Sequence, residues 1–129
     1  MVKKAFYIFL LFVLIACGDI VGNKITLNER YFIEAIDDDK NRSLYYSLKG
    51  GGGIGRVNNG VIAVGLNDTH IIIKQRYENA DRYYILDMTK DRGIAEPDDS
   101  VYGPYNIDQF ADARNDLNVE DALTFSRTF

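Results

Sequence analysis

The chain of 129 residues has little of what many catalytic and metal sites require. Its single cysteine, Cys17, excludes a disulfide framework and a cluster of thiolates. Its single histidine, His70, excludes a zinc site built from several histidines. No nucleophile motif is present, and His70 heads an apolar run, where we expect it to face water. Tryptophan, which would stack on sugar rings, is absent. We therefore expect no enzyme, no cofactor and no metal. The alternative is an uncharacterised hydrolase, which would need a deep pocket that holds His70 with two acids.

The chain is also short of positive charge. It has 15 lysine and arginine residues against 19 aspartate and glutamate residues, and a formal net charge of −4. Removing residues 1–16, which include Lys3 and Lys4, leaves 113 residues with a charge of −6. An acidic domain gains nothing from phosphate backbones or anionic lipid surfaces. We therefore expect no nucleic-acid partner.

The longest apolar run lies at the N-terminus. It extends from Ala5 to Ile15 after a basic start, and it is shorter than the ~20 residues of a membrane-spanning helix. This pattern is typical of a secretory signal peptide. The run closes in Leu14-Ile15-Ala16-Cys17, which resembles the lipobox of bacterial lipoproteins. The resemblance implies a signal peptide over residues 1–16, cleavage between Ala16 and Cys17, a diacylglyceryl group on the Cys17 sulfur, and acylation of the new amino terminus.

The N-terminus thus predicts an exported protein held to a bacterial membrane by its lipid. Residues 17–24 form a short tether, which spans at most about 25 Å at ~3.5 Å per residue. In a host with two membranes, Gly18 resembles a residue that permits sorting to the outer one. In a host with one membrane, the domain would face outward from the plasma membrane. The alternative is a plain signal peptide in which Cys17 is an incidental thiol.

Residues 25–129 are expected to form a single β-rich domain. Runs of β-branched and aromatic residues between turn signals predict strands at 25–27, 31–36, 44–48, 61–64, 70–77 and 82–86, with an edge strand at 122–125. The connections are too short for crossover helices, so neighbouring strands should pair antiparallel. The nearly continuous apolar run at 61–64 is typical of a strand covered on both faces.

One helix is expected near the C-terminus. The sequence there has a helical period, with Ile107, Phe110, Ala111, Arg114 and Leu117 at i, i+3, i+4, i+7 and i+10. Asn106 and Gln109 have the spacing of a capping box, and the helix should end near Asn118. The predicted fold is therefore α+β, an antiparallel meander of about five to seven strands with one C-terminal helix packed on the sheet.

The glycine cluster at 50–55 invites a phosphate-binding interpretation. Gly50, Gly52 and Gly55 match G-x-G-x-x-G, but that motif requires a following helix, and here a strand is expected to follow. A hairpin loop is the simpler interpretation. The alternative is a flexible loop beside Arg56 that closes over a ligand or meets a partner.

The polar run after residue 36 raises the question of calcium. Asp37, Asp39 and Asn41 have the spacing of the first three ligands of a calcium loop. Arg42 and Leu48 occupy the positions of the required glycine and the bidentate acid, which excludes an EF-hand. A looser calcium site and a solvated hairpin turn remain the two interpretations.

Tyrosine is the most suggestive surface signal. Adjacent tyrosines in a strand point to opposite faces, and tyrosine and arginine are enriched at protein interfaces. If one face of the sheet is uncovered, the candidate interaction surface consists of Tyr45, Tyr46, Arg56, Lys74, Arg76, Tyr83 and Tyr84.

The whole chain resembles a family of small bacterial lipoproteins of unknown function. The resemblance rests on the lipobox followed by Gly18-Asp19, the 31–38 segment, the 61–65 strand and Tyr102-Gly103-Pro104 before the helix. It implies a location and no activity. We expect a membrane-anchored, non-enzymatic binding module with an envelope protein as partner. The alternative is a small acidic inhibitor or immunity-type lipoprotein that blocks a basic toxin or hydrolase.

Overall fold

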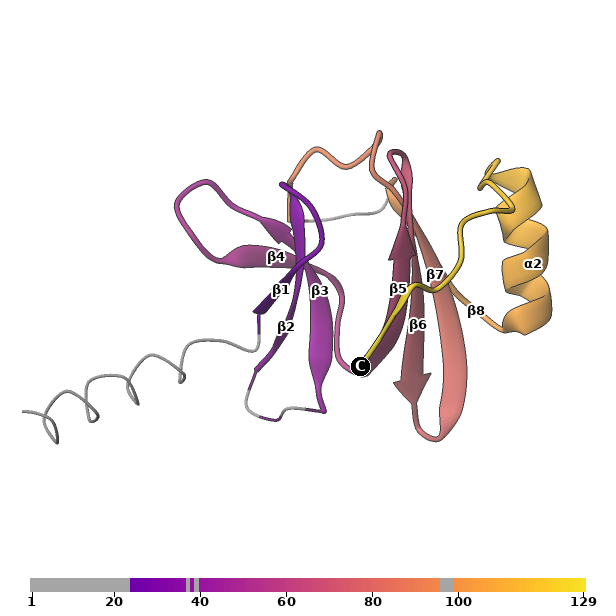
Figure 1. Ribbon diagram of the computed structural model, residues 1–129, viewed down its shortest axis with the longest axis horizontal. Coiled ribbons are helices and arrows are strands. Elements are labelled where there is room, and N and C mark those ends of the chain that lie inside the picture. Colours follow the sequence, from indigo (N-terminus) through magenta and orange to yellow (C-terminus); the bar gives the residue numbers. More distant parts are fainter. Residues whose placement is uncertain (1–23, 37, 39, 96–98) are drawn as a thin grey trace, which may run out of the picture.

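The computed structural model describes residues 24–36, 38, 40–95 and 99–129 (Figure 1). The first four strands form one antiparallel sheet in the order β1-β2-β3-β4, which we call the N-terminal sheet. Their bounds are β1 Lys24–Thr26, β2 Tyr31–Ala35, β3 Arg42–Ser47 and β4 Gly53–Val57.

The remaining strands form the C-terminal sheet, in the order β8-β7-β6-β5-β9 and again antiparallel. Their bounds are β5 Val61–Leu66, β6 His70–Tyr77, β7 Ala80–Asp87, β8 Val101–Tyr105 and β9 Arg127–Thr128. Helix α2, Ile107–Asp116, follows β8 directly. No helix among the described residues has both the length and the apolar character needed to cross a bilayer.

The two sheets pack face to face, and α2 covers the outer face of the C-terminal sheet (Figure 1). Ile33 and Leu44 of the N-terminal sheet share one core cluster with Val64 and Leu86 of the C-terminal sheet. A second cluster lies under the helix and includes Phe110. The molecule therefore has three layers, sheet, sheet and helix.

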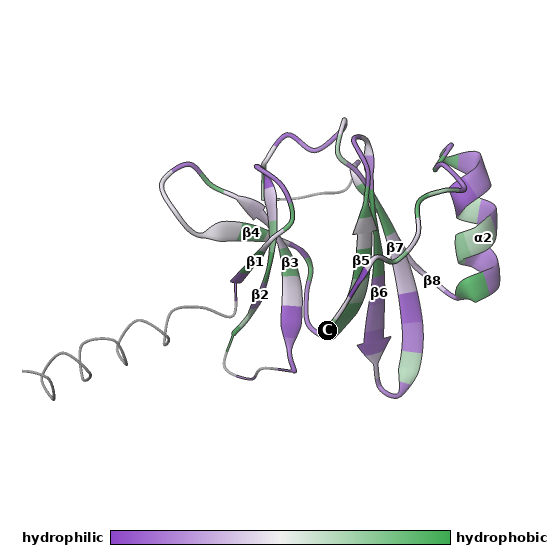
Figure 2. Ribbon diagram, viewed as in Figure 1, coloured by the Kyte–Doolittle hydropathy of each residue, from purple (hydrophilic) through white to green (hydrophobic). Residues whose placement is uncertain are grey.

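The central strand β6 is buried on both sides. Ile71, Ile72 and Ile73 are each fully buried. Because successive side chains of a strand point to opposite faces, Ile71 and Ile73 pack between the sheets, whereas Ile72 packs toward the helix. The strand becomes polar at Lys74, and Figure 2 shows hydrophilic residues gathering toward the β6–β7 turn.

The predicted α+β class, with a helix packed on the sheet, is confirmed. The described residues form nine strands rather than five to seven, and the meander divides into two sheets. Besides β9, two strands lie in segments where the sequence predicted none, β4 and β8. They contain glycine and proline, which disfavour strands, and pairing with β3 and β7 stabilises them. The edge strand expected at 122–125 was wrong, because the pairing segment is β9.

The predicted helix start is also confirmed. The Asn106 side chain accepts a hydrogen bond from the Gln109 backbone N–H, and the Gln109 side chain accepts one from the Asn106 backbone N–H. This is the capping box that the sequence predicted. The helix ends at Asp116, two residues before the expected Asn118.

Candidate binding surface

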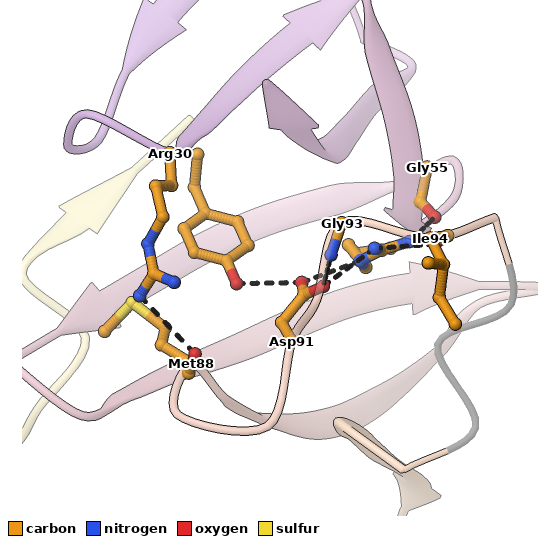
Figure 3. A network of polar contacts seen from close by, with 8 residues as sticks. Arg30, Gly55, Met88, Asp91, Gly93 and Ile94 are labelled. Atoms are coloured by element: carbon orange, nitrogen blue, oxygen red, sulfur yellow. Dashed lines mark hydrogen bonds and ion pairs between the residues drawn. The ribbon is translucent and has the colours of Figure 1, made fainter. Parts of the chain in front are cut away.

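A buried ion pair between Arg56 and Asp91 is among the polar contacts drawn in Figure 3. Arg56, on β4, donates from Nε to Asp91 Oδ2 at 2.8 Å and from Nη2 to Asp91 Oδ1 at 2.8 Å. The side chains are 0% and 1% exposed. Asp91 lies in the segment after β7, so this bidentate pair fixes that segment to the N-terminal sheet. We call the Arg56–Asp91 pair, with the groups bonded to it, the lock.

Four further groups complete the lock, and one of them is the Gly55 carbonyl, which accepts from Arg56 Nη1 at 3.3 Å. The Tyr31 hydroxyl donates to Asp91 Oδ2 at 2.8 Å, and the Gly93 backbone N–H donates to Asp91 Oδ1 at 2.9 Å. Arg56 Nη2 also donates to the Ile94 carbonyl at 2.9 Å (Figure 3). The Tyr46 ring lies edge-on to Tyr31, with centroids 5.5 Å apart. A Cβ added at Gly93 would lie 2.6 Å from the Tyr46 ring, so this close approach requires glycine.

The lock also fixes the protonation states of Asp91 and Tyr31. Burial would raise the pKa of Asp91, but hydrogen bonds from Arg56, Gly93 and Tyr31 outweigh it and hold that pKa below its ordinary value. Burial, together with the hydrogen bond to Asp91, raises the pKa of Tyr31 well above its ordinary value. Asp91 is therefore an anion and Tyr31 a neutral donor at neutral pH.

Beside the lock, two large hydrophobic side chains remain in water. Ile94 is 59% exposed, although Arg56 holds its backbone carbonyl, and Leu48 is 41% exposed directly after β3. Lys49 and Arg92 are exposed next to them. Leu48 follows Tyr46 by two residues, and Gly93, next to Ile94, packs on the Tyr46 ring. We call Leu48, Lys49, Arg92 and Ile94 the hairpin patch.

A family model described as "Protein of unknown function (DUF3997)" matches residues 28–128. The chain belongs to this family. The resemblance to an uncharacterised family is thereby confirmed, whereas the lipoprotein character stays a prediction. No curated protein and no solved structure matches the chain. The match covers every element of the DUF3997 fold from β2 onward, and so includes both the lock and the hairpin patch.

Of the predicted interaction surface, the part on the N-terminal sheet divides between its two faces. Tyr45 stacks on Phe32 with ring centroids 5.2 Å apart, whereas Tyr46 packs on Tyr31 in the lock. Arg56 was expected beside a flexible loop at the surface, and this was wrong. It is 6% exposed, because its guanidinium turns inward to Asp91.

The part on the C-terminal sheet is covered by the helix. Tyr83 is 8% exposed, because Phe110 stacks on it with centroids 4.9 Å apart, so its expected place on an open surface was wrong. Tyr84 is half-buried and donates its hydroxyl hydrogen to Gln75 Oε1 at 3.2 Å. Of this set, Lys74 and Arg76 reach the surface, where both pair with the Asp81 carboxylate.

His70 does not face water as expected. It is 8% exposed, and its Nδ1 lies 2.8 Å from the Thr69 hydroxyl oxygen. The side chain of Asn67 accepts a hydrogen bond from the His70 backbone N–H at 2.8 Å, which closes the turn before β6. No group of three or more histidine, cysteine, aspartate or glutamate residues in the described part of the chain is placed to hold a metal ion.

The glycine cluster forms the β3–β4 hairpin turn. Gly51 and Gly52 have φ of +99° and +75°, so they turn the chain in a way that other residues rarely can. At Gly53 a Cβ would lie 2.7 Å from the Phe32 ring, so this glycine makes room for the aromatic pair. Strand β4 follows rather than a helix, which confirms the hairpin interpretation over a dinucleotide site.

Several candidate residues lie outside the described part. Ala16 and Cys17 precede it, and Asp37 and Asp39 fall in its gaps. The lipid site and the calcium alternative therefore stay predictions. Asn41 is described, and its side chain accepts a hydrogen bond from the Gly60 backbone N–H at 3.2 Å.

Sequence reasoning missed Asp91, Leu48 and Ile94 as functional candidates. Asp91 lies in a polar stretch of sequence with no strand or helix periodicity, and a single aspartate in such a stretch carries no signal of burial. The one available hint was Ile94, a large apolar residue in an otherwise polar segment.

Proposed function

We propose that this DUF3997 protein is a lipid-anchored envelope module that binds another protein through the hairpin patch. The observation that carries the proposal is Ile94, which is 59% exposed on a backbone held by the buried lock. Exposed hydrophobic side chains grouped within a polar rim are typical of interaction sites. A rigid backbone also lowers the entropy lost on binding.

The lock supports this function in physical terms. A buried ion pair is weak evidence for stability, because desolvation offsets much of the attraction between its charges. Here the pair connects Arg56 to residues 35 positions away and sets where Ile94 lies. The ion pair therefore serves to fix the position of the hairpin patch. Lys49 and Arg92 favour a partner with acidic groups around an apolar pocket.

The membrane anchor is the second half of the proposal. It rests on Leu14-Ile15-Ala16-Cys17 and on the short distance from Cys17 to the first strand, which begins at Lys24. A protein held by its lipid at the membrane would meet an envelope partner at high local concentration, so a modest affinity would suffice.

A photo-crosslinking amino acid in place of Ile94, tested in the living native host, examines the binding surface directly. We expect one discrete protein adduct, which disappears in a Cys17→Ala background because the chain leaves the membrane. The matched control places the same crosslinker at Asp112, an exposed position on the helix. No adduct from position 94 in a membrane-bound, folded protein would overturn the proposed surface.

One observation favours the second candidate, an acidic inhibitor of a basic toxin or hydrolase. The solvent side of α2 carries Asp108, Asp112 and Asp116 at intervals of four residues, and Glu120 and Asp121 follow, all exposed. Like charges at this spacing destabilise an isolated helix slightly. In this case the Asp112 position would give the adduct, and binding would weaken steeply as salt increases.

A further inference from the structure

We infer that the end of the fold opposite the hairpin patch rests on the bilayer surface through Ile36, Tyr77 and Ile107. This inference rests on the proposed lipid anchor. These three side chains are 51%, 44% and 58% exposed, and they are among the few large hydrophobic residues left in water. We call the region around them the tether end.

The tether enters the fold beside Ile36. Lys24, the first described residue, pairs with Glu34 across the β1–β2 ladder, and Ile36 lies two residues beyond Glu34. The seven residues from Cys17 to Lys24 span at most about 25 Å. An acyl chain on Cys17 would thus hold this end of the N-terminal sheet close to the membrane.

The β6–β7 turn lies at the same end. The Asn41 side chain, in the turn after Ile36, accepts a hydrogen bond from the Gly60 N–H. Gly60 in turn accepts one from the Arg76 backbone N–H at 2.8 Å, next to Tyr77. These bonds place Asn41, Gly60 and Arg76 at one end of the molecule.

The start of the helix completes this end. Ala80, Asp81 and Arg82, after the β6–β7 turn, line a shallow hollow of about 340 Å³ together with Pro104, Tyr105 and Asn106. Ile107 follows Asn106 as the first residue of α2. The Arg82 guanidinium lies 4.2 Å from the centre of the Tyr77 ring, an arrangement of aromatic and basic groups that suits the interfacial zone of a bilayer.

The hairpin patch lies at the other end of the same strands. β2 runs from Tyr31, in the lock, to Ala35, beside Ile36. β3 runs in the reverse direction from Arg42 to Ser47, beside Leu48. A protein that rests on the tether end therefore presents Leu48 and Ile94 away from the membrane, where an envelope partner can reach them.

The contact is apolar rather than electrostatic. Lys24, Lys40 and Arg82 lie beside Glu34 and Asp81, so acidic groups offset most of the positive charge that this end offers to anionic lipids. Two isoleucines and a tyrosine would hold a free protein only weakly at a bilayer. The anchor makes the contact intramolecular, and a high effective concentration then keeps a weak contact occupied.

Single tryptophans test the orientation, because the chain has none of its own. The full-length protein, purified from host membranes with its lipid, is reconstituted in phosphatidylcholine vesicles with brominated acyl chains. We expect Ile107→Trp and Tyr77→Trp to lose emission and shift to shorter wavelength. The matched control Ile94→Trp, equally exposed in the structure, should keep the emission seen in unbrominated vesicles.

The outcomes separate the anchor from the orientation. A diacylglyceryl mass on Cys17, with flotation of the protein on the vesicles, establishes the anchor independently. If that holds and positions 77 and 107 are not quenched, the orientation is overturned and the proposed function survives. Quenching at position 94 as strong as at positions 77 and 107 also overturns the orientation. If the chain neither carries lipid nor floats with the vesicles, the proposed anchor is overturned, and the orientation that rests on it is overturned as well.

Discussion

Asp91 and Asp81 both bind arginine, yet they differ greatly in burial. Asp91 and its partner Arg56 are 1% and 0% exposed, whereas Asp81 and its partner Arg76 are 32% and 59% exposed. The N–O distances are nearly equal, at 2.8 Å and 2.9 Å. Distance alone therefore says little about what each pair does for the protein.

The two pairs also differ in how far apart their residues lie in the sequence. Arg76 and Asp81 face each other across one hairpin, five positions apart. Arg56 and Asp91 join two sheets, 35 positions apart. Water screens the first pair and can replace either partner, whereas no water replaces a lost partner in the second.

Asp91→Asn should be the most destabilising of these changes. It removes the charge that balances the buried Arg56 guanidinium, and an uncompensated buried charge costs about 3–5 kcal/mol. Urea unfolding at neutral pH measures the loss. The double variant Arg56→Met with Asp91→Leu should be less destabilised than Asp91→Asn, because it leaves no buried charge unpaired. A double variant at least as unstable as the single one would contradict this account.

The difference between wild type and Asp91→Asn should depend on pH. The pKa of Asp91 is lower in the folded protein than its ordinary value. A carboxyl of this kind stabilises the fold above its unfolded pKa of about 4, and the contribution is lost as pH falls through the lower folded value. The unfolding free energies of the two proteins should therefore differ by a constant amount above about pH 5 and converge in acid. A constant difference down to the acid transition would exclude Asp91 as the titrating group.

Tyr31→Phe should destabilise the fold by a smaller amount, about 1–2 kcal/mol. It removes the hydroxyl that donates to Asp91 Oδ2, but Asp91 keeps its bonds from Arg56 and Gly93. The ring and its packing on Tyr46 are retained. Urea unfolding measures the effect, and Tyr84→Phe, which removes a half-buried hydroxyl outside the lock, is the matched control. A loss as large as that of Asp91→Asn would mean that Tyr31 holds more than one bond in place.

Asp81→Asn should have the smallest effect, below about 1 kcal/mol. Arg76 and Lys74 also lower the pKa of Asp81, but both partners are accessible to water. The small loss should disappear in high salt, because salt screens exposed charges. If Asp81→Asn were as costly as Asp91→Asn, burial would not be the property that distinguishes the two pairs.

The parts of the fold that could be predicted from sequence are those set by local patterns. The capping box at Asn106 joins residues three positions apart, and the antiparallel hairpins follow from short connections. Strands β4 and β8 were missed, because their glycines and proline disfavour strands and only their partners stabilise them.

The hairpin patch was not predicted from sequence, because none of its four residues was in the candidate interaction surface. Lys74 and Arg76 reach the surface as expected. Tyr83 and Arg56 do not, because Phe110 covers the first and Asp91 binds the second, and both partners lie far along the chain. No local pattern distinguishes Arg56, which is buried, from Arg76, which is exposed.

The sequence by itself determined the secondary structure with helical or alternating periodicity, the helix cap and the exclusion of disulfides and multi-histidine metal sites. It also carries the N-terminal motif that predicts a lipid anchor. Tertiary structure alone decided that Arg56 and Tyr83 are buried and that Ile94 and Leu48 are exposed. The reason is that caps and hairpins join near neighbours, whereas burial depends on which distant segments meet. Because Arg56 and Asp91 lie 35 positions apart, no local pattern predicts that Arg56 is buried.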